Sequence, residues 1–155
     1  MKKINLVLSS LLFIAFFAAC SSSDGDNQAP AIKLIAPAEG AKLQIGKDVH
    51  FDMEVADNEK VASYKVDIHN NFDNHQHSRA NKEEKPFSFN KSWPVNQKQA
   101  KIHHHEIVIP EGVKAGNYHL MVFVTDEAGN ESHVTRNIVL VTEGGEDHHH
   151  HHEGE

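Results

Sequence analysis

The sequence predicts an all-β chain folded as a sandwich of short antiparallel strands. Several segments alternate apolar and polar residues with a period of two, which is the pattern of half-buried strands. Turn-forming residues separate these segments at short intervals. No window shows the apolar spacing of an amphipathic helix. Short strands at close spacing are typical of two sheets packed face to face.

Six segments carry the strand pattern directly. The connection 70–93 is long and polar, but Phe87, Phe89 and Trp93 indicate that its second half adds a further strand packed on the core. About seven antiparallel strands are therefore expected. In chain order, the six clear segments are AIKLIAP (31–37), KDVHFDMEVAD (47–57), VASYKVDIH (61–69), IHHHEIVIP (102–110), NYHLMVFVTD (117–126) and HVTRNIVLVT (133–142).

Two local features favour an immunoglobulin-like β-sandwich over other all-β folds. GNYHLMV places Tyr118 two residues before an inward apolar position, as in the tyrosine corner of immunoglobulin-like domains. DEAGNES (126–132) is typical of the turn between the last two strands of bacterial modules of this kind. We expect this domain to span residues 30–142.

The amino-terminal residues predict export and a lipid anchor. Residues 1–19 combine MKK, an apolar stretch and a small pair before a cut, which is the pattern of a secretory signal. Cys20, the only cysteine, follows this pair in FAAC, which resembles a bacterial lipobox. A stray thiol is the alternative, but an acylated Cys20 on the bacterial outer membrane, facing the periplasm or the cell surface, is favoured. The polar residues 20–29 predict a flexible tether.

The charge balance excludes some partners. Removing Lys2 and Lys3 with the signal leaves 13 of the 15 basic residues against 22 acidic ones, a net charge of −9 with neutral histidine. An acidic chain without a basic stripe does not predict nucleic-acid binding. It favours cations instead, and with a single cysteine no internal disulfide can form.

Histidines supply the candidate metal ligands. His69 ends one predicted strand and His119 begins its antiparallel neighbour, with both side chains on the outer face, so their side chains should lie about 5 Å apart. The loop after His69 carries Asp73, His75 and His77, and the two histidines of this HxH pair point the same way in an extended segment.

The HHHE stretch adds a second HxH pair. His103 and His105 share one face of their strand, and His104 faces the other way as a bystander. In the usual topology this strand belongs to the opposite sheet, so the pair forms a second site, or joins the first only if its strand lies at an edge. His50 and His133 are interpreted as solvated surface histidines. Zinc is the first expectation, with copper or nickel as alternatives.

The carboxyl-terminal residues 143–155 contain no core-forming residues and predict a disordered tail. The run His148, His149, His150, His151 and His152 would collect metal weakly. A purification tag is the alternative origin of this run, but the EGE ending and the intact signal favour a native tail.

Three stretches resemble a family of Bacteroidota lipoproteins with an immunoglobulin-like fold, a domain of unknown function: SYKVDIHNNFDNHQH, HHHEIVIP and AGNYHLMVFVTDEAGNES. The resemblance spans about residues 30–141. The family pattern of IHxNFDxHxH, HxHxIxIP and YH stretches falls on His69, Asp73, His75, His77, His103, His105 and His119, whereas HHHE departs from a plain HxH at His104. The resemblance implies fold and localisation, and metal binding is inferred from ligand chemistry alone.

The predicted function is a membrane-anchored binding module for a divalent transition metal. It would act as a scavenger, buffer or delivery protein, beside an outer-membrane transporter. The alternative is a structural or adhesive surface module whose histidines have no specific metal role. We do not expect an enzyme, although an open position on zinc beside Glu106 could activate water in principle.

Overall fold

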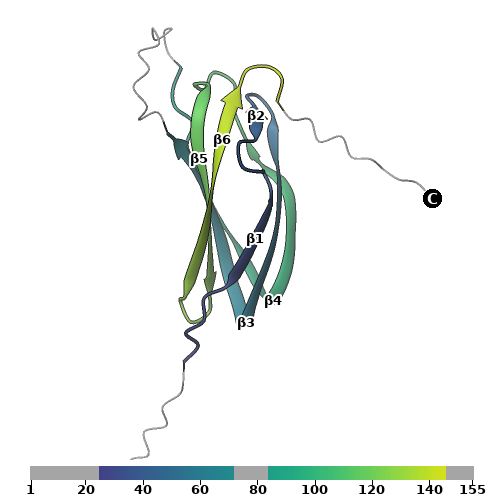
Figure 1. The fold of residues 1–155 in the computed structure, drawn as a ribbon, viewed down its shortest axis with the longest axis vertical. Helices are drawn as coiled ribbons and strands as arrows, with labels where there is room; N and C mark the ends of the chain where they lie inside the picture. Colours follow the sequence, from purple (N-terminus) through teal and green to yellow (C-terminus); the bar gives the residue numbers. More distant parts are fainter. Residues whose placement is uncertain (1–24, 72–83, 146–155) are drawn as a thin grey trace, which may run out of the picture.

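The computed structural model describes residues 25–71 and 84–145, and within these residues it contains six strands and no helix (Figure 1). The predicted all-β class is therefore confirmed. In the described part of the chain there is accordingly no helix long and apolar enough to cross a membrane. The strands are β1 (Ala31–Ala36), β2 (Lys42–Gln44), β3 (Asp48–Asn70), β4 (Phe89–Val108), β5 (Gly116–Asp126) and β6 (Glu131–Val141).

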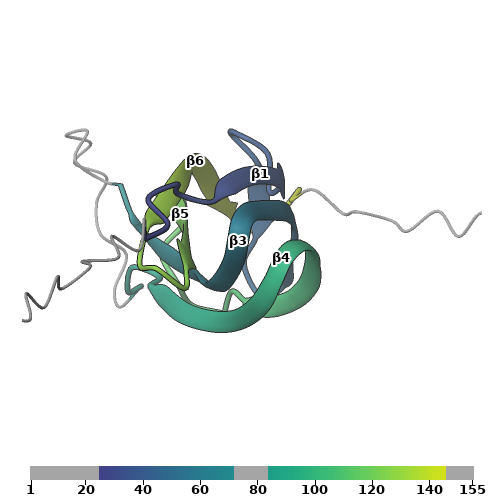
Figure 2. The ribbon, with the colours of Figure 1, turned by 90° about the horizontal axis from the view of Figure 1, so that it is seen from below.

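Two long bent strands, β3 and β4, connect the two layers of the sandwich. The first half of β3 pairs with β1 on one side and with the second half of β4 on the other. The second half of β3 pairs with β5 and with the first half of β4. Seen from below, both strands curve from one layer into the other (Figure 2). β6 continues the second layer beside β5 and carries β2 at its far edge.

The bends occur where the strand register shifts. In β3 the pairing with β4 is irregular between Ala56 and Val61, and in β4 Asn96 has a left-handed backbone with φ of 57°. Asparagine tolerates this conformation better than most residues. The matching irregularities let the two strands turn together and resume their pairing beyond the bend.

Strand limits differ from the expectation in three places. The segments 47–57 and 61–69 form one continuous β3, because pairing with β4 and β5 resumes directly after the bend. The strand expected at 102–110 begins earlier, at Phe89, so it includes the predicted extra strand. β2 was not expected, since three residues are too short for a periodic pattern, and it runs parallel to β6.

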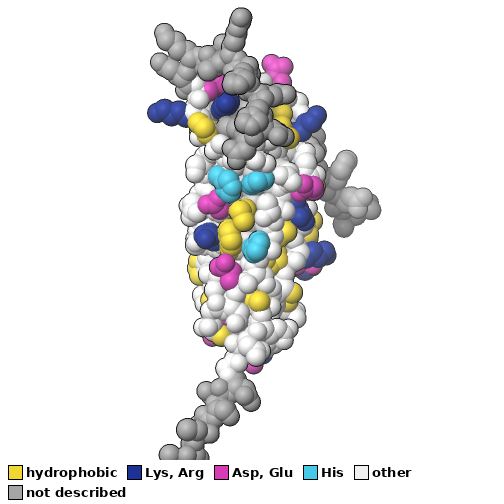
Figure 3. Space-filling view, turned by 60° about the vertical axis from the view of Figure 1, so that its left-hand side comes forward, with side chains coloured by type: hydrophobic (Ala, Val, Ile, Leu, Met, Phe, Trp, Pro, Cys, Tyr) yellow, Lys and Arg dark blue, Asp and Glu magenta, His cyan; other side chains and the backbone are white. Residues whose placement is uncertain are grey.

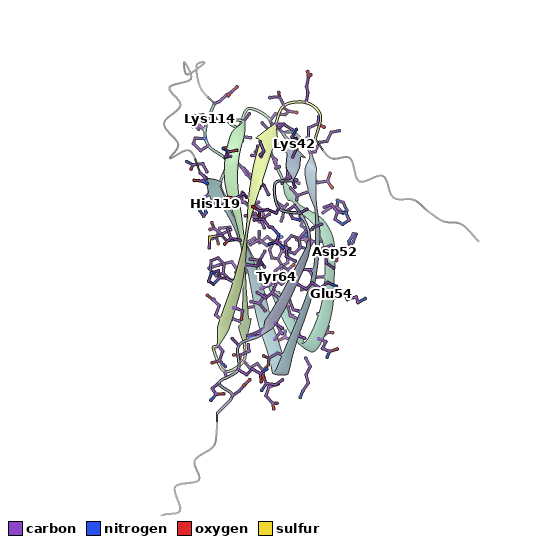
Figure 4. The ribbon with its side chains drawn as sticks, in the orientation of Figure 1. Lys42, Asp52, Glu54, Tyr64, Lys114 and His119 are labelled. Carbon is purple, nitrogen blue, oxygen red and sulfur yellow. The ribbon has the colours of Figure 1, made fainter. Side chains whose placement is uncertain are left out.

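Alternation along the strands places the core between the layers. Apolar side chains at every second position are buried, which fixes the register because a slip of one residue would turn each of them to solvent. The polar residues between them therefore face outward. Figure 4 shows Tyr64 between the layers and His119 on the outside. The core residues with at most 1% exposed are Val49, Phe51, Met53, Val61, Val66, Ile68, Ile107, Ile109, Tyr118, Leu120, Val122, Val124, Ile138 and Leu140.

Both immunoglobulin-like features predicted from the sequence are present. The hydroxyl of Tyr118 donates a hydrogen bond to the carbonyl of Lys114 at 2.7 Å and accepts one from the amide of Phe87 at 3.1 Å. This is the geometry of a tyrosine corner. In the turn between β5 and β6, Asp126 accepts hydrogen bonds from the backbone and side-chain amides of Asn130 at 2.8 and 2.7 Å.

Candidate metal-binding sites

The predicted pairing of His69 with His119 is confirmed. The two residues lie directly opposite each other in the β3–β5 ladder, and their ring centroids are 5.6 Å apart. Both residues are partly buried. The face seen in Figure 3 carries histidine side chains beside acidic and hydrophobic ones. Two imidazoles at this separation supply two ligands of one ion once their rings turn toward it.

Neighbouring polar groups orient this histidine pair. Nδ1 of His69 lies 2.6 Å from a carboxylate oxygen of Asp67, and the amide nitrogen of Asn71 lies 2.8 Å from Nε2 of His119. Burial acts to raise the pKa of Asp67, but hydrogen bonds from His69 and Asn90 outweigh it and lower that pKa. His69 therefore keeps Nε2 for a metal ion. Nε2 of His119 accepts the hydrogen bond from Asn71, so His119 would bind a metal ion through Nε2 after this hydrogen bond is released.

Several predicted site residues lie outside the described residues. They are Cys20, Asp73, His75, His77 and the histidines 148–152. The pair formed by His69 and His119 is thus the described part of the first predicted site.

A second group, the histidine triad, consists of His50, His103 and His105. One ring nitrogen of each residue lies within 4.8 Å of the others. The ring centroid of His50 is 4.8 Å from that of His103 and 5.2 Å from that of His105. The three residues meet because β3 and β4 are antiparallel neighbours and all three side chains occupy outward positions.

The triad is close to the geometry of a zinc site. In a tetrahedral site with Zn–N bonds of 2.0–2.1 Å, ligand nitrogens are about 3.4 Å apart. The nitrogens of the triad lie within 4.8 Å of one another, so small side-chain rotations bring them onto one ion. His103 and His105 are exposed and His50 is partly buried, so a fourth position remains open to solvent.

Asp48 orients His105 through a hydrogen bond on the side of the ring away from the triad. Its carboxylate oxygen lies 2.6 Å from Nδ1 of His105, which donates the hydrogen bond. A carboxylate on one ring nitrogen fixes the orientation of the imidazole and raises the basicity of the other nitrogen. His105 therefore presents Nε2 to a metal ion.

His104 faces the opposite way, as expected of a bystander. Its ring stacks on Phe51 at 4.9 Å and lies 5.0 Å from the ring of Trp93. Burial is the main reason that the pKa of His104 is lowered.

Glu106 lies near His104. Its carboxylate accepts hydrogen bonds from Lys91 and from Trp93, which lower its pKa. The Glu106 carboxylate is therefore held beside the side chains of Lys91 and Trp93.

One interpretation is wrong. His50 is not a solvated surface histidine, because it packs against His103 and His105 in the triad. His103 and His105 lie in the other layer, as expected of their strand, and they group with His50. Among the described residues, no group of three potential ligands joins them to His69 and His119. The missed signal was the outward position of His50 between buried Val49 and Phe51, on a strand that neighbours the HxH strand.

Comparisons with known proteins identify the family of this chain. The solved fibronectin(III)-like modules of Clostridium thermocellum CbhA are similar over 74% of this chain and 99% of theirs, with 17% sequence identity and a TM-score of 0.38. No curated protein matches. A family model described as "Domain of unknown function (DUF4625)" matches residues 18–141. With its immunoglobulin-like sandwich, the chain belongs to this family.

Proposed function

We propose that the protein is an exported, membrane-anchored lipoprotein that binds a divalent transition metal, with zinc as the first candidate. The observation that carries this proposal is the histidine triad, in which three ring nitrogens from two paired strands lie within 4.8 Å of one another. Copper and nickel are alternatives, because imidazole also suits both metals.

The open side of the triad supports a transfer role rather than a purely structural one. Structural zinc sites are usually closed by four protein ligands, whereas sites with three keep an exchangeable position. Two of the three histidines are exposed, so an incoming ligand can reach the ion. A scavenger, buffer or delivery module needs such access, beside an outer-membrane transporter.

The remaining predicted ligands extend this proposal. His69 and His119 would form a second site together with Asp73, His75 and His77 of the following loop. The histidines 148–152 would collect metal weakly and pass it to the folded sites. Acylated Cys20 would hold the protein at the membrane.

The test is a zinc titration against a competing chelator, in the full chain with histidines 148–152 replaced by serine. Replacing His103 and His105 by alanine should remove the tightest binding event, because it leaves one of three ligands. His133→Ala is the matched control, since this exposed histidine lies on β6 and should leave the affinity unchanged. Unchanged tight binding in the double variant refutes the triad.

Replacing His69 and His119 in the same background tests the second site separately. We expect this change to remove a weaker event and to leave the tightest one intact. Loss of the tightest event instead would move the principal site to the β3–β5 pair.

The sandwich fold also favours a structural or adhesive surface module, since its apolar core is complete without a metal. Thermal unfolding with zinc and with EDTA separates the two functions. A ligand that binds only the folded state raises the melting temperature of the protein. An identical melting temperature in both conditions supports the structural module.

A further inference from the structure

We propose that Asp26, Asp57 and Asp126 form a calcium site that fastens the segment before β1 to the end of the sandwich. One carboxylate oxygen of each residue lies within 4.8 Å of the others. The three residues come from separate places: the segment before β1, the bend of β3 and the end of β5. Figure 1 shows these places together at the lower end of the molecule.

Two enclosed oxygens in this cluster favour the binding of a cation. Oδ2 of Asp26 and Oδ1 of Asp57 are each shielded from solvent and accept no hydrogen bond. The side chain of Asp126 is also buried, with 3% of the residue exposed. An enclosed carboxylate oxygen without a partner is unfavourable, and three carboxylates in one place repel one another. A bound cation removes both costs.

The other oxygens of two of these carboxylates are held by hydrogen bonds. Oδ2 of Asp57 accepts from the backbone amides of Glu59 and Lys60 at 2.8 and 2.9 Å. Oδ1 of Asp26 accepts from the side-chain amide of Asn58 at 2.9 Å. One oxygen of each carboxylate is thus fixed, and the enclosed one is left for a ligand.

The nearby lysines pair with other groups and do not neutralise the three aspartates. Lys60 pairs with Glu127, and Lys98 pairs with Glu59 and donates to the carbonyl of Asn58. Among the described residues, no lysine or arginine forms an ion pair with the three aspartates. A bound cation would supply the positive charge that the lysines and arginines of the described residues do not.

The donor set selects a hard cation. All three ligands are carboxylates, and a set made only of oxygens suits calcium, whereas imidazole and thiolate suit zinc or copper. Calcium takes six to eight oxygen ligands, so carbonyl groups and water would complete the shell. Calcium sites of extracellular modules have dissociation constants of about 10⁻⁴–10⁻³ M.

A bound calcium ion would fix the direction in which the tether leaves the domain. The backbone carbonyl of Asp26 already accepts a hydrogen bond from the side chain of Asn130 at 3.0 Å. Calcium would add a second connection between the same segments. Where Cys20 carries the anchor proposed above, the domain would be held at a defined angle to the membrane.

The test is thermal unfolding of the full chain, first stripped with EGTA and then titrated with CaCl₂ to several millimolar. We expect the melting temperature to rise by about 4 °C at several millimolar CaCl₂, and less with MgCl₂. Asp57→Asn and Asp26→Asn should abolish the shift. In EGTA both variants should be at least as stable as the wild type, because a repulsive charge is gone.

Glu131→Gln is the matched control, since it removes one exposed carboxylate from β6 and should keep the calcium shift. Asp26 precedes β1, so Asp26→Asn leaves the core intact and stays informative where Asp57→Asn does not fold. No calcium shift in the wild type overturns the proposal, as does an equal shift in Asp26→Asn. Zinc binding is measured in a separate experiment, so a negative result with calcium does not contradict zinc binding at the triad.

Discussion

Asp48 orients one histidine of the triad, although it would not touch the metal. Its hydrogen bond at 2.6 Å sets the ring of His105 and leaves Nε2 for the ion. Loss of such a carboxylate usually weakens metal binding by about 10–100-fold. We expect Asp48→Asn to weaken zinc binding within this range, measured by chelator competition. Glu131→Gln removes the same charge from another strand and should change the affinity little; equal weakening in both variants would reduce the effect of Asp48 to net charge.

His104 makes the folded protein sensitive to acid. Its burial lowers its pKa below the usual 6.5, so the unfolded chain binds a proton more readily than the folded one. The native state therefore loses stability as the pH falls below about 6.5, and the loss is complete below the pKa of the folded state.

Replacement of His104 by phenylalanine should remove this part of the acid sensitivity, because phenylalanine stacks on Phe51 and Trp93 without titrating. Urea unfolding at pH 7.5 and pH 5.0 measures the difference. The wild type should lose more stability between these values than His104→Phe, with EDTA present to exclude metal effects. His133→Phe, at an exposed position, should behave as the wild type; the same acid response in His104→Phe would contradict the assignment.

At the scale of the elements, the tyrosine corner ties the start of β5 to two neighbouring segments. Tyr118 is fully buried and its hydroxyl joins the carbonyl of Lys114 and the amide of Phe87. Removing the hydroxyl leaves the carbonyl of Lys114 and the amide of Phe87 with one partner fewer, which costs about 1–3 kcal/mol.

Tyr118→Phe should therefore lower the free energy of unfolding by this amount in urea denaturation. Tyr64→Phe is the control, because Tyr64 is also buried but its hydroxyl makes no hydrogen bond within the described residues. We expect it to cost less than Tyr118→Phe. Equal losses in the two variants would show that the corner contributes nothing beyond packing.

The elements also show how far the sequence predicts this structure. Period-two alternation located β1, β5, β6 and both halves of β3, because burial of one face leaves a direct trace in residue type. The same alternation placed His69 opposite His119. It could not show that β3 passes through its bend unbroken, since ADNEK contains turn-forming residues and pairing with β4 decides the outcome. β2 depends on its parallel contact with β6, which three residues do not encode.

Two of the three residues of the triad were predicted as ligands, and the third was missed for a related reason. The HxH spacing puts His103 and His105 on one face whatever strand lies beside them, so local geometry is sufficient. His50 joins them through strand pairing between residues about fifty positions apart. The acidic cluster is harder still to predict from the sequence, because Asp26, Asp57 and Asp126 come from the segment before β1, the bend of β3 and the end of β5. Only the closed fold brings them together.

At the scale of the whole molecule, the predicted anchor determines where the metal sites would act. We expect the full chain, expressed in its native envelope, to sediment with membranes, because acyl chains on Cys20 partition into lipid. Cys20→Ser should release the folded protein to the soluble fraction, and Ser21→Ala should not. Fractionation followed by immunodetection measures this. A Cys20→Ser variant that still sediments with membranes would exclude lipidation as the cause.

The two proposed ions should stabilise the molecule independently, because the one ligand that each site takes from β3 lies at a different part of that strand. His50 and Asp57 are seven residues apart on an extended strand, which corresponds to about 23 Å. Effects at sites more than about 10 Å apart without shared partners usually add. The rise in melting temperature with zinc and calcium together should therefore equal the sum of the separate rises within about 1 °C. His103→Ala should remove only the zinc part and Asp57→Asn only the calcium part; a zinc shift that depends on Asp57 would mean that the sandwich transmits changes along β3 between its two ends.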